Sequence, residues 1–184
     1  IRMNLDLLAE DFQNPQTPRD KRILGKIERV RSEGQRLQNI LEDFLRFARV
    51  QEPRTQLVDL HSVIDDLRDF FEPQATVHGI VTRAHYCDDL PPIPLDVDLF
   101  KQALLNLLLN AQQAMSEGGE MILTTRKEGD FVVLDVVDTG TGIAPEAQPK
   151  VFEAFYSSRP GGSGLGLPTA RKIVESHGGF LRLQ

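Results

Sequence analysis

The sequence predicts an α+β protein, a helical hairpin followed by an α/β two-layer sandwich. Residues 1–52 carry only helical periodicity, whereas helix-like and strand-like stretches alternate from residue 53 onward. In the second part, one glycine-rich turn follows a strand and another opens a helix, an arrangement that favours a phosphate-containing ligand. We therefore expect a dimerisation hairpin at 1–52 and a nucleotide-binding domain at 53–184.

Composition narrows the possible partners. The 184 residues are 40% hydrophobic with a net charge of −6, which argues against nucleic acid and against an anionic membrane surface. A single cysteine, Cys87, excludes an intramolecular disulfide and favours a reducing, cytoplasmic location. No apolar run reaches the roughly 18 residues of a membrane span. The chain starts inside a helical pattern, so we expect a longer protein whose membrane anchor, if present, lies outside this chain.

The hairpin is predicted from apolar residues spaced three or four apart. In the second helix these are Ile23, Ile27, Val30, Leu37, Leu41 and Phe44, with Gly34 within the seam; in the first they are Ile1, Leu5, Leu8 and Phe12. Pro15 and Pro18 mark the break between the two helices, and Glu52-Pro53 marks the end of the second helix. Two helices cannot cover both stripes, so we expect a homodimer that forms a four-helix bundle. Packing of the stripes on the chain's own second domain is the alternative.

The first half of the α/β domain begins with a short strand at Thr55–Val58. Asp59 is expected to cap a helix with an apolar face that includes Phe70 or Phe71. Residues 80–86 alternate like a strand, and the three prolines within 88–94 predict a loop. Asp96 then opens a helix with one apolar side, made of Phe100, Leu104, Leu107, Leu108 and Ala111.

The second half continues with a β-hairpin, 121–127 and 131–138, around Glu128-Gly129-Asp130. A turn and a short helix should lead to Phe152. The last helix is expected at 165–177, ended by Gly178-Gly179, and a strand should begin at Phe180.

Asn106 and Asn110 are one helical turn apart, so their side chains project from one side of the helix. A neutral amide oxygen is a suitable ligand for Mg²⁺, which also keeps waters and takes phosphate oxygens. Surface or capping amides are the alternative interpretation.

Asp138 ends an apolar strand and precedes Gly140 and Gly142. A carboxylate at this point can accept a hydrogen bond from the amino group of adenine, whereas guanine presents a carbonyl. The two glycines allow the backbone to approach a flat base. An ordinary strand-to-helix turn is the alternative.

Gly162–Leu167 is a glycine-rich loop that runs into a helix, whose free amide groups are suited to phosphate. Residues 152–160, aromatic at one end and polar at the other, are typical of a hinged lid. Arg159 would reach the terminal phosphates from that lid. A flexible linker with a surface arginine is the alternative.

Four segments together resemble the catalytic ATP-binding domain of two-component sensor histidine kinases, members of the Bergerat-type ATPase superfamily. They are similar to the asparagine box (LLNLLLNAQQAM), the first glycine box (DTGTGI), the phenylalanine box (FEAFYSSR) and the second glycine box (GGSGLGL). Upstream, FLRFAR and DLPPIPLD resemble the stretch that joins such domains to their dimerisation hairpin. The resemblance covers nearly the whole chain.

The resemblance implies an ATP:protein-histidine phosphotransferase that uses ATP and Mg²⁺ and passes the phosphoryl group to the receiver domain of a response regulator. It implies that Asn110 binds Mg²⁺, that Asn106 and Arg159 act in catalysis, and that Asp138 recognises adenine. Further ATP contacts are expected from Gln113, Gly140, Gly142, Ile143, Ser158, Gly162, Ser163, Gly164, Leu165, Gly166 and Leu167.

Three features depart from the family pattern. No histidine precedes His61, so the acceptor is expected upstream of Ile1. Gln113 and Ala114 stand where the family often has a lysine and an aromatic residue, as in its nitrogen-regulator-like branch. The sheet's usual last strand is expected after Gln184, which would expose a sheet edge.

Two other functions remain possible from the sequence. One is an ATPase or serine kinase of the same superfamily, in which ATP would be turned over without a histidine acceptor. The other is a nucleotide-binding dimerisation scaffold that transfers no phosphate.

Overall fold

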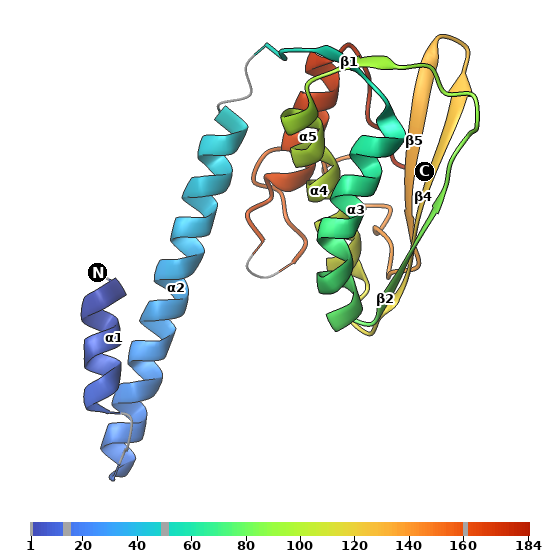
Figure 1. Cartoon of the computed structure of the whole chain (residues 1–184). Coiled ribbons are helices and arrows are strands. Elements are labelled where there is room, and N and C mark those ends of the chain that lie inside the picture. The colour runs from blue at the N-terminus through green and yellow to red at the C-terminus, as the bar shows by residue number, and fades with distance from the viewer. Residues whose placement is uncertain (1, 13–15, 49–51, 160–161) are drawn as a thin grey trace. The chain divides into compact units, whose positions relative to one another are not determined.

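The computed structural model describes residues 2–12, 16–48, 52–159 and 162–184. The chain divides into two compact units, Ile1–Arg46 and Phe47–Gln184 (Figure 1). The boundary expected between residues 52 and 53 stays a prediction, and residues 49–51 beside it lie outside the described part. Over that part, no helix combines the length and apolar character needed to cross a membrane.

The first unit consists of α1 (Arg2–Asp11) and the longer α2 (Pro18–Ala48), which run antiparallel (Figure 1). α2 begins with a capping arrangement: Thr17 Oγ1 accepts a 3.2 Å bond from Asp20 N, and the Asp20 carboxylate accepts a 2.9 Å bond from Thr17 N. Arg31 and Asp6 form an ion pair of 3.8 Å between the two helices. The predicted contributions of Ile1 and Pro15 and of the Leu5 side chain lie outside the described residues.

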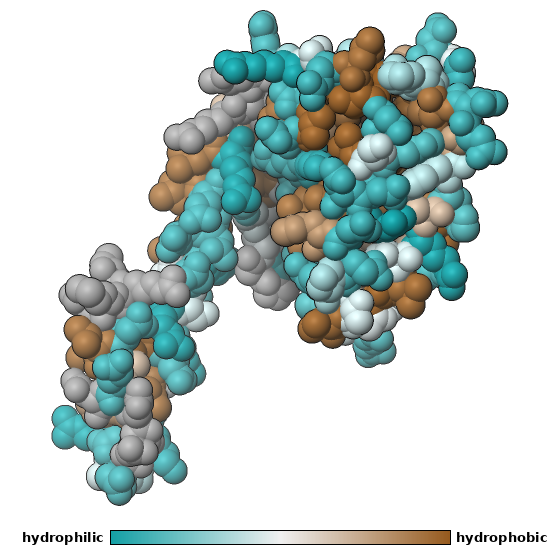
Figure 2. Space-filling model, viewed as in Figure 1, coloured by the Kyte–Doolittle hydropathy of each residue, from teal (hydrophilic) through white to brown (hydrophobic). Residues whose placement is uncertain are grey.

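Most of the apolar stripe of α2 is exposed. Ile27 is buried, but Val30, Leu37 and Leu41 remain 54%, 66% and 56% exposed. Hydrophobic side chains accordingly reach the surface of this unit, brown among the teal in Figure 2. A Cβ at Gly34 would meet nothing within 4 Å. The two helices of one chain therefore leave this stripe open to solvent.

The second unit is built on a three-stranded sheet in the order β2-β4-β5. β2 (Ile80–His85) pairs parallel with β4 (Gly119–Glu128), and β4 pairs antiparallel with β5 (Phe131–Asp138). The helices α3 (Leu60–Val77), α4 (Val97–Ala114) and α5 (Gly166–Ser176) lie to one side of it (Figure 1). The predicted α+β class is confirmed.

The hydrophobic core shows which apolar residues of α3 and α4 are buried. Phe71, not Phe70, is the buried aromatic of α3: Phe71 is 1% exposed and Phe70 is 73% exposed. The prediction that α4 has one apolar side is wrong. Leu104 and Leu108 pack into the core between α3 and the sheet, whereas Leu107 packs with Ala103 against α5. α4 is thus the central helix, packed on two sides, and only a narrow strip of it can carry polar residues.

Three local predictions need correction. The loop expected over 88–94 contains part of β3 (Ile93–Leu95), which pairs antiparallel with β1 (Gln56–Val58). Pro94 is tolerated because this two-stranded sheet consists only of edge strands. Before Phe152 the chain makes successive hydrogen-bonded turns instead of a short helix. No strand begins at Phe180, because residues 180–184 make no ladder bonds in the described part.

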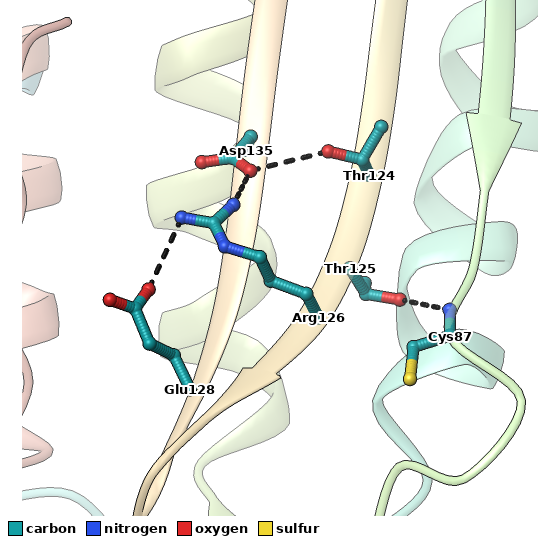
Figure 3. A network of polar contacts seen from close by, with 6 residues as sticks. All are labelled: Cys87, Thr124, Thr125, Arg126, Glu128 and Asp135. Carbon is teal, nitrogen blue, oxygen red and sulfur yellow. Dashed lines mark hydrogen bonds and ion pairs between the residues drawn. The ribbon is translucent and has the colours of Figure 1, made fainter.

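The alternation of β4 separates two environments (Figure 3). Thr124 and Arg126 both contact Asp135 of β5 on the sheet face away from the helices, and Arg126 also reaches Glu128. Thr125 points the other way and accepts a 3.0 Å bond from Cys87 N. Polar contacts of Arg126 and Asp135 therefore lie on the outer face of the sheet, and α4 lies on the opposite face.

Candidate functional site

The polar strip of α4 consists of Asn106, Asn110 and Gln113. At spacings of four and three residues these side chains share one side of the helix, between its two apolar sides. Both asparagines are half-buried and Gln113 is exposed. In the described part of the chain, neither asparagine side-chain amide has a hydrogen-bond partner. These amides are therefore free to bind a ligand.

The turn after β5 lies against the C-terminal end of α4. Thr141 N donates a 3.1 Å bond to the carbonyl oxygen of Ala114. A Cβ on Gly140 would come within 2.7 Å of Ala114 Cβ and its carbonyl oxygen, so only glycine allows this approach. Asp138 Oδ1 accepts a 2.9 Å bond from Gly140 N, which orients the carboxylate and leaves Oδ2 without a partner among the described residues. Asp138, which the sequence predicts to recognise adenine, is thus held beside α4 with one carboxylate oxygen available.

The loop before α5 is tied to the segment that precedes it. Phe155 N donates a 3.0 Å bond to Gly164 O, and a Cβ on Gly164 would lie 2.5 Å from the Phe155 carbonyl carbon. Gly164 has φ +66°, and Phe155, at φ +67°, is the single non-glycine residue with positive φ in the described part. Such backbone strain concentrates at functional sites. The strain at Phe155 was not predictable from the sequence.

The start of α5 faces the first asparagine of α4. A Cβ added to Gly166 would lie 4.0 Å from Asn106 Oδ1. Ser163 Oγ accepts a 3.4 Å bond from Leu165 N, and Leu165 is fully buried. Gly162 is exposed, and Leu167 is half-buried in the first turn of α5. These placements bring the free amides of a helix N-terminus to the polar strip of α4.

The predicted lid reaches α4 through its arginine. Arg159 Nη1 donates a 3.1 Å bond to Gln113 Oε1 and a longer one, 3.5 Å, to the backbone carbonyl of Asn110. Ser158 is exposed and makes no hydrogen bond within the described residues, and residues 160–161 lie outside them. The structure therefore brings Arg159 to the polar strip but gives Ser158 no defined role.

The remaining predicted residues line the turn between the two glycines. Gly142 has φ +69° with no atom within 4 Å of an added Cβ. Ile143 is half-buried, and its carbonyl accepts a 3.2 Å bond from Gln148 Nε2. Neither residue contacts α4 through a bond in the described part, so their place beside a base rests on the position of Asp138.

Three segments far apart in the chain therefore meet on α4. Residues 95–184 match the family of histidine kinase-, DNA gyrase B- and HSP90-like ATPases. The sensor kinase CckA of Brucella abortus (strain 2308) is 33% identical over 169 residues, which are 83% of this chain and 18% of that protein. The alginate biosynthesis sensor protein KinB of Pseudomonas aeruginosa is 32% identical over 190 residues, 100% of this chain and 31% of that protein. The chain belongs to the sensor histidine kinases.

A solved structure supports the same fold for the kinase. Full-length ShkA, crystallised in complex with AMPPNP, is 27% identical with a TM-score of 0.71, over 96% of this chain and 41% of that chain. The present chain spans a third or less of the length of the curated relatives it matches. It therefore represents the part of such a kinase that carries the ATPase-like domain.

Two residues that support the candidate site were not predicted from the sequence. Thr169 is buried, and its hydroxyl donates a 2.6 Å bond to the carbonyl of Leu165, the N-cap residue of α5, which supports the first turn of that helix. Thr139 Oγ1 accepts a 3.0 Å bond from Glu120 N, which ties the Asp138 turn to β4. Threonine beside glycine-rich segments is too common to have marked either one.

Metal binding by acidic clusters has no support in the described part of the chain. No group of three or more His, Cys, Asp or Glu residues is arranged there to hold a metal ion. A cation at the polar strip would have neutral amide ligands from the protein, and other oxygens would complete its shell.

Proposed function

We propose that this chain binds Mg²⁺-ATP and supplies the catalytic part of a longer histidine kinase. That kinase transfers the γ-phosphoryl group to a histidine outside the chain, and a response-regulator aspartate then receives it. The main support for this proposal is that three segments meet on α4. Gly140 packs against Ala114, Gly166 lies beside Asn106, and Arg159 donates a hydrogen bond to Gln113. Catalysis in phosphoryl transfer is mainly positioning and charge stabilisation, and such an arrangement supplies both.

Each cluster has a role in this proposal. Asp138 accepts a hydrogen bond from the adenine amino group through its unpartnered oxygen. The glycine-rich loop Gly162–Leu167 gives backbone amides to the phosphates, and Arg159 donates to the terminal phosphate. As the histidine nitrogen bonds to the γ-phosphorus, the bond from that phosphorus to the β,γ-bridging oxygen breaks and ADP leaves.

Mg²⁺ fits the donors that the polar strip offers. The Asn110 amide oxygen is unpartnered in the described part, and Mg²⁺ accepts a single protein oxygen when phosphates and waters fill its other positions. Asn106 supports the same shell from one turn away. The cation, when bound, neutralises charge on the phosphate oxygens.

None of the four histidines lies on the helical hairpin, where the acceptor is expected. His61 Nε2 contacts Thr125 Oγ1 at 2.9 Å, His78 Nδ1 contacts Gln74 O, and His85 lies on β2. His177 Nε2 accepts a 3.0 Å bond from Asp96 N, while its Nδ1 lies 2.8 Å from Ile173 O. His177 therefore has both ring nitrogens engaged as a helix cap. The acceptor is accordingly a histidine of the longer protein.

The exposed stripe of α2 supports a homodimer. Full burial of a large apolar side chain contributes about 1.5–3 kcal/mol, and Val30, Leu37 and Leu41, which are 54–66% exposed, would gain the part of it that a second hairpin still provides. A four-helix bundle formed by two chains covers all of them.

Incubation with γ-labelled ATP tests the proposed transfer. We expect this chain to remain unlabelled and to label a separately added kinase hairpin that carries an acceptor histidine. Label on the chain itself would contradict the outside acceptor. Brisk phosphate release without any hairpin, and no label on the hairpin, would instead indicate an ATPase of the same superfamily. ATP binding with neither label nor release would indicate a scaffold without transfer activity.

A further inference from the structure

Gln113 extends the polar strip of α4 by one turn beyond Asn110 and meets a cation there. Its Oε1 accepts the 3.1 Å bond from Arg159 Nη1. A guanidinium has donors and no acceptor, so the oxygen of the amide, not its nitrogen, must face the arginine. The only acceptor atom of the Gln113 side chain, Oε1, is therefore already bonded to Arg159.

The acceptors that hold Arg159 are both neutral. They are the Gln113 amide oxygen and, at 3.5 Å, the Asn110 carbonyl oxygen. Arg159 has no ion pair in the described part of the chain, whereas Arg171, in the neighbouring helix, pairs with Glu175 at 2.7 Å. The guanidinium of Arg159 is thus oriented but its charge is not neutralised, and it can still form a charge-assisted bond with an anion.

The backbone at Arg159 is also held in place. Ser157 Oγ accepts a 3.2 Å bond from Arg159 N and donates a 3.0 Å bond to Arg159 O. Gly162 N donates a 3.4 Å bond to the same carbonyl, and a Cβ on Gly162 would collide with Ser157 Oγ. The turn therefore fixes where the arginine starts, and Gln113 fixes where its guanidinium ends.

We propose that Gln113 is a positioning residue that holds the Arg159 guanidinium beside Asn110, ready for the terminal phosphate of ATP. This role differs from a direct phosphate contact by Gln113. It rests on the proposed function, because it assumes that ATP is the ligand of this strip. A planar guanidinium held at two points keeps its remaining donors aimed in one direction, an advantage that a mobile lid arginine would lack.

A double-mutant cycle tests the proposal. Dissociation constants for Mg²⁺-ATP and for AMP are measured by calorimetry on the unaltered chain, on Gln113→Ala, on Arg159→Ala and on the double variant. We expect each single variant to weaken ATP binding by roughly tenfold, the size of one charged hydrogen bond. The double variant should bind ATP no more weakly than Arg159→Ala, and AMP affinity should be unchanged throughout.

The matched control is Gln38→Ala, another exposed helical glutamine, which bonds to Glu42 in α2 and should alter neither constant. Losses that add in the double variant would show that Gln113 contacts the ligand itself and would overturn the proposal. So would unchanged ATP binding by Gln113→Ala, or a parallel loss of AMP binding. A failure of the unaltered chain to bind ATP would instead refute the proposed function on which the inference depends.

Discussion

At the scale of single residues, the chemistry of the site depends on a few polar atoms that the fold leaves without partners. Asp138 uses Oδ1 to accept the bond from Gly140 N, and Oδ2 stays free within the described residues. The Asn106 and Asn110 amides are similarly free, although both are half-buried. None of these atoms is buried without a partner, so they remain open to solvent and available to a ligand in the described part of the chain.

Asp138→Asn should weaken ATP binding by about 1–3 kcal/mol, because its new amino group would face the adenine amino group, donor against donor. The Oδ1 acceptor for Gly140 is retained, so the turn should survive. Calorimetry with ATP gives the change directly. Asp135→Asn is the control: Asp135 contacts Thr124 and Arg126 on the outer sheet face and should not affect ATP. Equal ATP affinity in Asp138→Asn and the unaltered chain would remove the adenine assignment.

Asp96 should make stability sensitive to acid. Burial raises the pKa of its carboxyl group, but hydrogen bonds from the Leu99 and Arg54 backbone N–H groups outweigh it and hold the pKa below 3.8. Because the Asp96 pKa is lower in the folded than in the unfolded chain, the ionised carboxylate stabilises the fold above pH 3.8. This stabilisation is lost as the pH falls through the pKa of the folded state.

Asp96→Ala should therefore lower the free energy of unfolding by about 0.5–2 kcal/mol near neutral pH, as the loss of a helix N-cap does. The difference in the free energy of unfolding between the variant and the unaltered chain should narrow as the pH is lowered past 3.8. Urea denaturation across this pH range measures both. Asp89→Ala, at an exposed loop residue without bonds in the described part, should show no gap at any pH. A pH-independent gap for Asp96→Ala would contradict the account.

At the scale of secondary-structure elements, α4 organises the site because it packs on two sides and exposes one polar strip. The loop before α5 and the turn after β5 both approach it through glycines. A side chain added at one of these glycines should lower stability where other protein atoms fill the space beside it. It should instead weaken ligand binding where that space is left for the ligand.

Gly164 and Gly166 provide a matched pair of substitutions. Gly164→Ala places a Cβ within 2.5–2.7 Å of Phe155 and Tyr156 backbone atoms at φ +66°, so the free energy of unfolding should fall by about 1–3 kcal/mol. Gly166→Ala meets only Asn106 Oδ1 at 4.0 Å, so stability should be kept while phosphate binding is hindered. Thermal unfolding and ATP titration separate the two effects. Equal stability losses, or full ATP affinity in Gly166→Ala, would argue against this loop as a phosphate site.

Elements with local signals were predictable from the sequence, and those that depend on distant pairing were not. Asp59 and Asp96 cap α3 and α4 as expected, because a cap needs only the residues next to it. β3 was missed because Pro94 within it and the two prolines just before it favour a loop, and its partner, β1, lies far earlier in the chain. In the site, helical spacing was enough to predict the Asn106–Asn110 strip. The contact between Arg159 and Gln113 joins segments that no local pattern relates.

At the scale of the whole molecule, two compact units present different surfaces. The first exposes the apolar stripe of α2, and the second carries the proposed nucleotide site on α4. Clustered exposed apolar residues mark an interaction surface. We therefore expect the first unit to mediate association and the second to bind ATP.

Replacing Leu37 and Leu41 together by Glu should convert the proposed dimer to a monomer, because two charges would enter the seam that the proposed four-helix bundle buries. Sedimentation equilibrium measures the mass, and ATP affinity, a property of the second unit, should be retained. Ser32→Glu, at an exposed position outside the seam, should stay dimeric. A monomeric unaltered chain, or a double variant of unchanged mass, would refute the predicted homodimer.

Titration of the unaltered chain with Mg²⁺-ATP in a calorimeter tests the central claim most directly. If the Asp138 turn, the loop before α5 and the lid arginine hold a single nucleotide against α4, heat should saturate at one ATP per chain. AMP, which lacks the terminal phosphates, should bind more weakly at the same site. The absence of any heat at millimolar ATP would contradict the account.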